Sequence, residues 1–309
     1  MQGKTLKKIC ALICGVVLCG SAIPCLSASA ETTSDGYQQE TYYEYKPGNP
    51  NPVKEYNLDT RPPAIATISD DGDDDERPLL TPLDQKIVNI GYNTTGSIIS
   101  DNAILVCAHT FFPRGRNFEE PSGVQIVNSN VSQTDDENSV KKLVVTGYHL
   151  PKKFVENPTI NTYDYAIITA KIDNGDGTYS DLSDYGHFDM GIPLESLENK
   201  PGAFKTIRLC GFYYKGMGKN PEGQEFTKAW LKESIGEITD IESLQIKYNA
   251  LSAGGTSGAP IYMDKNYNGQ HFQTLIGIHT GPGFGVKVNQ MLLKFALSNP
   301  NVDDDFIRS

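Results

Sequence analysis

From Lys86 onward the chain consists of short runs rich in Ile, Val, Thr and Tyr, separated by Gly, Asn and Asp. Such runs favour strands and their separators favour turns. They form two groups of about six, near 86–92, 97–100, 103–107, 124–127, 141–149 and 166–171, then near 205–212, 234–240, 244–249, 259–263, 274–279 and 285–288. A helical apolar stripe appears only at Asn289–Leu297, before Pro300. The pattern predicts an all-β fold of two six-stranded antiparallel β-barrels with a C-terminal helix.

The first 30 residues have the features of a signal peptide. Lys4, Lys7 and Lys8 precede the apolar run Ile9–Ile23, and Ala28–Ala30 offers an A-x-A cleavage site. The apolar run is too short and too often interrupted by glycine to be a convincing membrane span, and no later run is long enough. We therefore expect a secreted, extracellular protein that does not associate with a membrane after signal cleavage.

The next stretch, Glu31 to about Arg61, is polar and rich in Tyr, Pro and Asn, without a sustained period. This composition is typical of a disordered segment or a pro-segment. We expect a zymogen with a pro-segment at 31–66, whose second cut falls between Arg61 and Ile68. The N-terminal barrel is expected at 67–190 and the C-terminal barrel with the helix at 191–309, joined near Asp184–Pro201.

Charge and cysteine usage exclude several classes. The net charge of −11 argues against nucleic acid and anionic membranes as partners. Four of the six cysteines lie in the first 30 residues, so only Cys107 and Cys210 remain, which is no disulfide framework. Their apolar neighbours favour two buried free thiols, and a disulfide between them is the alternative.

Two acidic stretches are candidate cation sites. The spacing of Asp70–Glu76 does not match an EF-hand loop, so a solvated acidic turn is the better interpretation and a calcium loop the alternative. Asp173–Gly177 reads most simply as a hairpin turn, with a metal site as the weaker alternative. We expect no metal and no cofactor.

A serine lies among glycines in Gly254–Pro260, between strand-like runs at 244–250 and 261–263. Glycines before a serine allow a tight path in which successive N–H groups point at one spot. Such a path can hold an oxyanion beside a nucleophilic hydroxyl. An ordinary glycine-rich β-turn is the alternative.

A serine nucleophile needs a base, and the base needs a group that fixes its tautomer. The five histidines are His109, His149, His187, His271 and His279. His109 ends an apolar strand-like run, and Asp164 directly precedes another, Tyr165–Ile168. Either residue alone is more often a packed or turn residue. Together, in the order His, Asp, Ser, they indicate an active site assembled between the two barrels.

These segments resemble trypsin-like (chymotrypsin-fold) serine peptidases. Ala103–His109 is similar to their strand that ends in the catalytic histidine, and Tyr163–Ile168 to their Asp-Leu-Ala strand. Gly255–Pro260 resembles their Gly-x-Ser-Gly-x-Pro motif. Ile276–Gly281 resembles the Gly-Ile-His segment of the bacterial glutamyl endopeptidases, and the resemblance covers roughly 86–297.

The resemblance implies a chymotrypsin-like fold and a role for each matching residue. Ser257 would be the nucleophile, His109 the general base and acid, and Asp164 the orienting carboxylate. The backbone N–H groups of Gly255 and Ser257 would form the oxyanion hole. Thr110 stands where many such enzymes have cysteine, so their disulfide at this position is absent.

The same resemblance implies a specificity pocket lined by Ser252 and His279, with Thr280 and Gly281 pairing with the substrate main chain. Leu251 stands where a pocket for basic residues would need an aspartate, which argues against cleavage after Lys or Arg. A histidine and a serine can pair with a carboxylate in a partly dry pocket. We expect cleavage after Glu, with Asp slower, and an apolar preference is the alternative.

The sequence thus predicts a secreted, monomeric serine endopeptidase that acts on proteins or peptides. The rival from another class is a catalytically silent trypsin-like binding or adhesion module. An α/β-hydrolase is rejected because its order is Ser, Asp, His and because Ala259 replaces the second glycine of its motif. A cysteine peptidase lacks a recognisable signature at Cys107 or Cys210.

Overall fold

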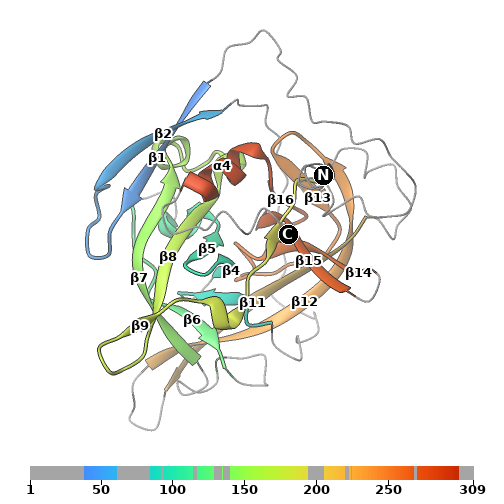
Figure 1. The fold of residues 1–309 in the computed structure, drawn as a ribbon. Helices are drawn as coiled ribbons and strands as arrows, with labels where there is room; N and C mark the ends of the chain where they lie inside the picture. The colour runs from blue at the N-terminus through green and yellow to red at the C-terminus, as the bar shows by residue number, and fades with distance from the viewer. Residues whose placement is uncertain are drawn as a thin grey trace, which may run out of the picture.

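The computed structural model describes residues 38–60, 84–91, 94–113, 117–128, 134, 140–193, 205–219, 223, 225–267 and 270–298. Within them the expected fold class is confirmed. Two closed antiparallel β-barrels of six strands each lie side by side, followed by a short helix (Figure 1). Each strand expected from Lys86 onward is present, but its ends differ, most for the long pair β11 (Thr206–Lys219) and β12 (Glu225–Ile241), expected at 205–212 and 234–240. Runs of β-branched residues locate strands better than they delimit them.

The first barrel supplies the expected histidine and aspartate. Neighbouring strands pair in a ring that closes between its last and first members: β3 (Ile87–Ile90), β4 (Thr94–Ser100), β5 (Ala103–Val106), β8 (Ala166–Asp173), β7 (Val140–Pro151) and β6 (Val124–Val127). Every residue of β3, β4, β5 and β6 is buried. Short segments follow or connect these strands: η2 (Ala108–Phe111), α2 (Lys152–Glu156), η5 (Asn161–Tyr163), β9 (Tyr179–Ser180) and η6 (Ser183–Tyr185).

The second barrel supplies the expected serine. Its ring closes in the same way: β11 (Thr206–Lys219), β12 (Glu225–Ile241), β13 (Gln245–Tyr248), β16 (Phe284–Lys287), β15 (Gln270–Gly281) and β14 (Pro260–Tyr267). β10 (Asp189–Met190) adds to β15 in parallel, so the second sheet already begins within the expected join. In α4 (Gln290–Ser298) the expected stripe is buried: Met291, Leu292, Phe295 and Ala296.

The expectation of a disordered segment before the first barrel is wrong for residues 38–60. β1 (Gln38–Tyr45) and β2 (Lys54–Thr60) form an antiparallel hairpin, and β1 pairs with the end of β7 (Figure 1). Tyr42 is fully buried and stacks on Phe295 of α4 at a centroid distance of 4.2 Å. Tyr42 and Tyr45 are buried residues of β1, and the polar average composition of the segment concealed them. That the segment is a pro-segment stays a prediction.

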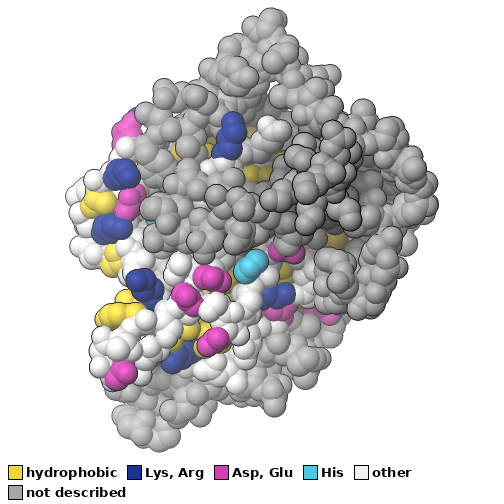
Figure 2. All heavy atoms as spheres, viewed as in Figure 1, with side chains coloured by type: hydrophobic (Ala, Val, Ile, Leu, Met, Phe, Trp, Pro, Cys, Tyr) yellow, Lys and Arg dark blue, Asp and Glu magenta, His cyan; other side chains and the backbone are white. Residues whose placement is uncertain are grey.

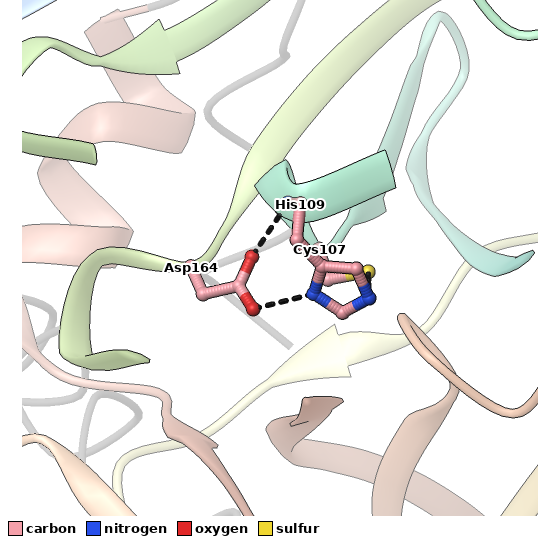
Figure 3. A group of neighbouring side chains, drawn as sticks. All are labelled: Cys107, His109 and Asp164. Carbon is pink, nitrogen blue, oxygen red and sulfur yellow. Dashed lines mark hydrogen bonds and ion pairs between the residues drawn. The ribbon is translucent and has the colours of Figure 1, made fainter. Parts of the chain in front are cut away.

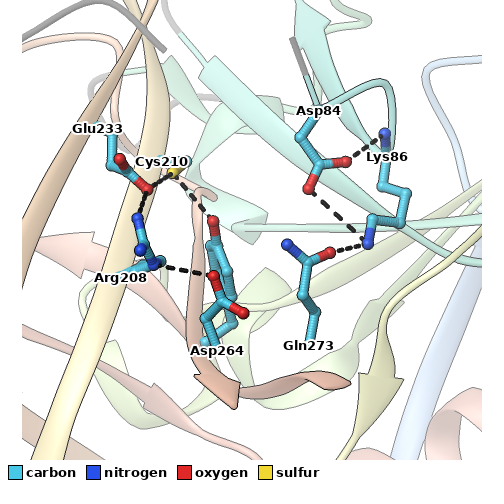
Figure 4. Close-up of polar contacts among 8 residues, drawn as sticks. Asp84, Lys86, Arg208, Cys210, Glu233, Asp264 and Gln273 are labelled. Atoms are coloured by element: carbon cyan, nitrogen blue, oxygen red, sulfur yellow. Dashed lines mark hydrogen bonds and ion pairs between the residues drawn. The ribbon is translucent and has the colours of Figure 1, made fainter. Parts of the chain in front are cut away.

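Polar contacts also link the two barrels (Figure 4). Lys86, just before β3, contacts Gln273 of β15 and lies over the ring of Phe188 at 4.5 Å. Within the second barrel, Arg208 of β11 lies between Glu233 and Asp264, with 3.0 Å between Arg208 Nε and Asp264 Oδ2. Lys86 thus links the first barrel to β15 of the second, whereas the Arg208 ion pairs join strands within the second barrel.

The two remaining cysteines are both free and buried, as the preferred interpretation of the sequence predicted. Cys210 lies in β11, where its sulfur is 3.3 Å from the Tyr262 hydroxyl. Burial raises the pKa of the Cys210 thiol far above its ordinary value. A buried thiol of this kind is inert rather than nucleophilic.

Asp173–Gly177 forms the expected hairpin turn between β8 and β9. Asp176 Oδ1 accepts hydrogen bonds from the main-chain N–H and the hydroxyl of Thr178, so the turn itself uses this carboxylate. Asp70–Glu76 lies outside the described residues. On the face shown in Figure 2 the described acidic and basic side chains are interspersed. The described part of the chain holds no helix with the length and apolar character needed to span a membrane.

Candidate active site

His109 and Asp164 are brought together by the strand pair β5 and β8. Val106, at the end of β5, pairs with Ala166 at the start of β8, so the segments beyond these residues leave the sheet at the same place. The Asp164 carboxylate accepts two hydrogen bonds from His109, one from the main-chain N–H at 2.8 Å and one from Nδ1 at 2.6 Å (Figure 3). This double contact fixes both the backbone and the ring of the histidine, and it leaves the lone pair on Nε2.

The electrostatics of the pair suit a base that must become charged. Asp164 is 3 % exposed, and the His109 side chain is 36 % exposed. Burial lowers the pKa of His109, but the charge of the Asp164 carboxylate, the neighbouring Cys107 sulfur and the hydrogen bonds to both outweigh this, and the pKa lies well above its ordinary value. The pair therefore stabilises an imidazolium at His109.

The Nε2 side of His109 faces an unexpected neighbour. Cys107 Sγ lies 3.5 Å from Nε2 (Figure 3). The same sulfur lies 3.2 Å from the hydroxyl of Thr110. Because Nδ1–H donates to Asp164, Nε2 of the neutral ring is an acceptor, and the thiol can act as a weak donor to it. Sequence reasoning treated Cys107 only as a buried thiol and missed this contact.

The glycines around Ser257 are required by the backbone. Gly255 and Gly258 have φ angles of 97° and 81°, a region that side chains strongly disfavour. A Cβ atom at Gly255 would lie 2.4 Å from the carbonyl oxygen of Phe212, and one at Gly258 would lie 2.1 Å from that of Thr95. The Gly-x-Ser-Gly pattern thus allows the serine loop to press against β11 and against β4 of the other barrel.

Thr95 of β4 fastens the serine loop to the first barrel. Its main-chain N–H donates to the Ser257 carbonyl oxygen at 2.8 Å, and its hydroxyl donates to the Gly255 carbonyl oxygen at 2.9 Å. The same hydroxyl accepts the N–H of Phe212 at 2.8 Å. β4 lies beside β5, the strand that leads to His109, so these bonds hold the serine loop next to the histidine. Nothing in the sequence around Thr95 signals this role.

The serine hydroxyl and two N–H groups of the serine loop make no hydrogen bond within the described part of the chain. No hydrogen bond links Ser257 Oγ to His109 Nε2 in the described part of the chain, and Ser257 is partly exposed. The N–H groups of Gly255 and Ser257 have no acceptor among the described residues, whereas Thr256 N donates to Ala253 O at 3.0 Å. Two N–H groups of one tight loop are therefore available to an oxygen of a ligand.

His279 of β15 lies directly beside the serine loop. Its carbonyl oxygen accepts the N–H of Gly258 at 2.7 Å, and its own N–H donates to Ala259 O at 2.9 Å. Its side chain is buried, with Nδ1 in contact with the hydroxyl of Tyr248, which also donates to Phe284 O at 3.2 Å. Sequence reasoning missed Tyr248, which fixes the orientation of the His279 ring.

The other expected pocket residues are placed less tightly. Ser252 and Gly281 are partly buried, and Gly281 pairs with Phe284 across β15 and β16. The buried hydroxyl of Thr280 has no hydrogen-bond partner among the described residues. Leu251 carries no charge and is 66 % exposed, so this position does not supply the buried negative charge that a pocket for Lys or Arg would need.

No protein-family model and no curated protein matches this chain. Among solved structures, the chain is similar to one described as a Glu endopeptidase in complex with MPD. The similarity has a TM-score of 0.50 and 19 % sequence identity, and it covers 72 % of this chain and 95 % of that one. It establishes the fold, and the expected chymotrypsin-like architecture is confirmed.

Proposed function

We propose that this protein is a serine endopeptidase that forms an acyl-enzyme on Ser257. The observation that carries the proposal is the His109–Asp164 pair, with its doubly bonded carboxylate, held next to a glycine-framed serine loop by Thr95. The structure of a Glu endopeptidase with the same fold supports peptide-bond hydrolysis as the reaction. Proteins or peptides are the substrates, and the enzyme is a monomer.

Each group has a defined step. His109 Nε2 takes the proton from Ser257 Oγ as this oxygen attacks the peptide carbonyl, and it later gives the proton to the leaving amine. Asp164 holds Nδ1 and stabilises the imidazolium that forms. The N–H groups of Gly255 and Ser257 donate to the oxyanion of the tetrahedral intermediate. For the first step the serine hydroxyl must displace the Cys107 thiol from Nε2.

The proposed specificity is cleavage after Glu, with Asp slower. His279 supports it, because two main-chain hydrogen bonds hold this residue against Gly258 and Ala259, beside the nucleophile. A carboxylate that leaves water needs hydrogen bonds and an opposite charge, which a protonated His279 and the hydroxyl of Ser252 supply. Thr280 and Gly281 bind the substrate main chain. An apolar preference is the competing outcome, in which a neutral His279 only packs against the substrate.

The protein is exported as a zymogen. Residues 1–30 act as the signal peptide, and a cut between Arg61 and Ile68 breaks the covalent link between the pro-segment and the enzyme. The features that support this are the cationic and apolar start of the chain and its A-x-A site. All of these residues lie outside the described part of the chain.

The test of the reaction is Ser257→Ala. We expect a folded protein whose peptidase activity is lower by about 10⁴-fold or more, with His109→Ala similar and the double variant no worse, because the two residues act as a unit. Ser180→Ala, at an exposed serine of β9, is the matched control. A fluorophosphonate should label the wild type and the control but not Ser257→Ala.

A binding or adhesion module would give a different result. It would show no labelling and no peptide hydrolysis in the wild type, while the Ser257→Ala variant would bind its partner as the wild type does. Near wild-type hydrolysis by purified Ser257→Ala would exclude Ser257 as the nucleophile.

A further inference from the structure

Cys107, His109 and Asp164 form a group of ligating side chains in which one sulfur, one ring nitrogen and one carboxylate oxygen lie within 4.8 Å of one another. Their arrangement differs from a chance acidic cluster. Asp164 accepts the Nδ1 proton of His109, so Nε2 presents its lone pair to the sulfur of Cys107 (Figure 3). A histidine that binds a metal through one nitrogen almost always donates its other N–H to a carboxylate or carbonyl in this way.

The spacing of the two softer ligands fits a zinc ion. Zn–S and Zn–N bonds meeting at a tetrahedral angle place the sulfur and the nitrogen about 3.6 Å apart. The observed separation between Cys107 Sγ and His109 Nε2 is 3.5 Å. Thiolate and imidazole ligands favour Zn²⁺ over the hard cations Mg²⁺ and Ca²⁺, which prefer oxygen.

The ligand pair of Cys107 and His109 is accessible to an ion, and neighbouring polar groups contact both residues. Cys107 is buried, but the His109 side chain beside it is 36 % exposed, so an ion can approach along the imidazole edge. The hydroxyl of Thr110 lies 3.2 Å from the sulfur and donates to Thr94 Oγ1; rotation of its O–H bond would let it donate to a thiolate instead. Both carboxylate oxygens of Asp164 accept hydrogen bonds from His109. Asp164 therefore orients the histidine ligand and does not bind the metal itself.

We propose that Cys107 and His109 form an inhibitory Zn²⁺ site within the catalytic centre. Zn²⁺ binds neutral His109: Zn–S and Zn–N bonds form, the Cys107 S–H bond breaks, and the proton of Cys107, with any proton on His109 Nε2, passes to solvent. Some water molecules leave the hydrated ion, and others keep its remaining positions. The occupied Nε2 can no longer accept the proton of Ser257. The site goes beyond the proposed peptidase function, because the metal binds whether or not Ser257 reacts.

The first experiment measures inhibition of peptide hydrolysis by ZnCl₂, with EDTA to reverse it. We expect Cys107→Ala to raise the inhibitory concentration by about tenfold or more, since it removes one of two protein ligands. Cys107→Ser, which preserves the size of the side chain, should do the same if the alanine variant folds poorly. Cys210→Ala, at the buried thiol of the other barrel, should leave the inhibitory concentration unchanged. Equal sensitivity of the wild type and both Cys107 variants would overturn the proposal.

The second experiment detects the metal directly and does not depend on catalysis. Cd²⁺ is titrated into Ser257→Ala, and the ultraviolet thiolate-to-cadmium charge-transfer band is followed. We expect the band to saturate at one ion per chain, to be abolished by Cys107→Ser and to be weakened by His109→Ala. If the wild-type protein hydrolyses no peptide but Ser257→Ala shows the band, the proposed function is contradicted and the zinc site is upheld. Absence of the band would exclude the site.

Discussion

The main-chain N–H of Thr95 donates a 2.8 Å hydrogen bond to the carbonyl oxygen of Ser257, so a residue of the first barrel holds the expected nucleophile of the second. The Thr95 hydroxyl adds a bond to Gly255 O and accepts one from Phe212 N. A fully buried threonine with both roles of its hydroxyl used cannot be replaced by an apolar residue without leaving polar groups unsatisfied.

The first prediction follows from this contact. Thr95→Val keeps the shape of the side chain but strands Gly255 O and Phe212 N, so the free energy of unfolding should fall by roughly 2–4 kcal/mol. We also expect kcat to fall more than KM rises, because the serine loop shifts relative to His109. Urea denaturation and steady-state kinetics measure both effects. Thr95→Ser is the control and should lie near the wild type; a Val variant equal to the Ser variant would contradict the prediction.

The second prediction concerns pH. Catalysis needs neutral His109, and Asp164 raises the pKa of His109 well above its ordinary value, so kcat/KM should rise with pH through a midpoint above about 6.5. Asp164→Asn removes the charge, lowers this pKa and should shift the rise to lower pH. It should also reduce the plateau by about 10⁴-fold, because the imidazolium loses its partner.

The control for this profile is Asp184→Asn, at an exposed carboxylate of η6. It should reproduce the wild-type midpoint and plateau. An Asp164→Asn variant with an unchanged midpoint would show that the carboxylate does not set the pKa of His109.

The third prediction concerns specificity. The Tyr248 hydroxyl donates to Phe284 O and therefore accepts from Nδ1 of His279, which makes Nε2 of a neutral His279 an acceptor. His279 must then be protonated to donate to a carboxylate, so the preference for Glu over Gln should increase as pH falls. His279→Leu should cost roughly 2–5 kcal/mol in kcat/KM for Glu substrates and far less for Phe substrates.

Tyr248→Phe provides the finer test of this arrangement. Without the hydroxyl the ring loses its fixed orientation, so the Glu-to-Gln ratio and its pH dependence should both decrease while hydrolysis of Phe substrates changes little. The measurement is kcat/KM on peptides that differ only at the residue before the cut. Equal losses for Glu and Phe substrates in His279→Leu would exclude a carboxylate pocket at this histidine.

The fourth prediction concerns the hairpin of β1 and β2. A cut between Arg61 and Ile68 should leave it in place, because β1 pairs with β7, and Tyr42 stacks on Phe295 and contacts the Tyr165 hydroxyl at 3.1 Å. We expect the cut protein to elute as one species in native gel filtration. A denaturing gel of that fraction should show two chains. Tyr42→Ala should release the short chain, since losing a buried aromatic side chain costs roughly 3–5 kcal/mol. Tyr179→Ala, at an exposed tyrosine, is the control. Separate elution of the wild-type chains would count against retention.

The sequence predicted the features that depend on neighbours along the chain. Strand positions followed from β-branched runs, α4 from its apolar stripe, and the glycines beside Ser257 from the tight turn that they allow. The contacts of Thr95, Cys107 and Tyr248 could not be predicted, because they depend on how closed sheets are packed and on which side-chain atoms then meet. The hairpin was missed because its buried tyrosines, Tyr42 and Tyr45, do not alternate along the strand and lie next to a polar, Pro- and Asn-rich turn.

The hairpin has a further consequence for solubility. One edge of β7 pairs with β8. Along the other edge, β6 pairs only with the first residues of β7, and β1 pairs with the last residues of β7, from Tyr148 to Pro151. Tyr148 and Leu150 are buried there. The outermost strand is instead β2, which begins with Lys54 and Glu55, and charged residues discourage edge-to-edge association of sheets. A chain that lost residues 38–60 would exchange a charged edge for an apolar one, and its molecules would tend to aggregate through β7.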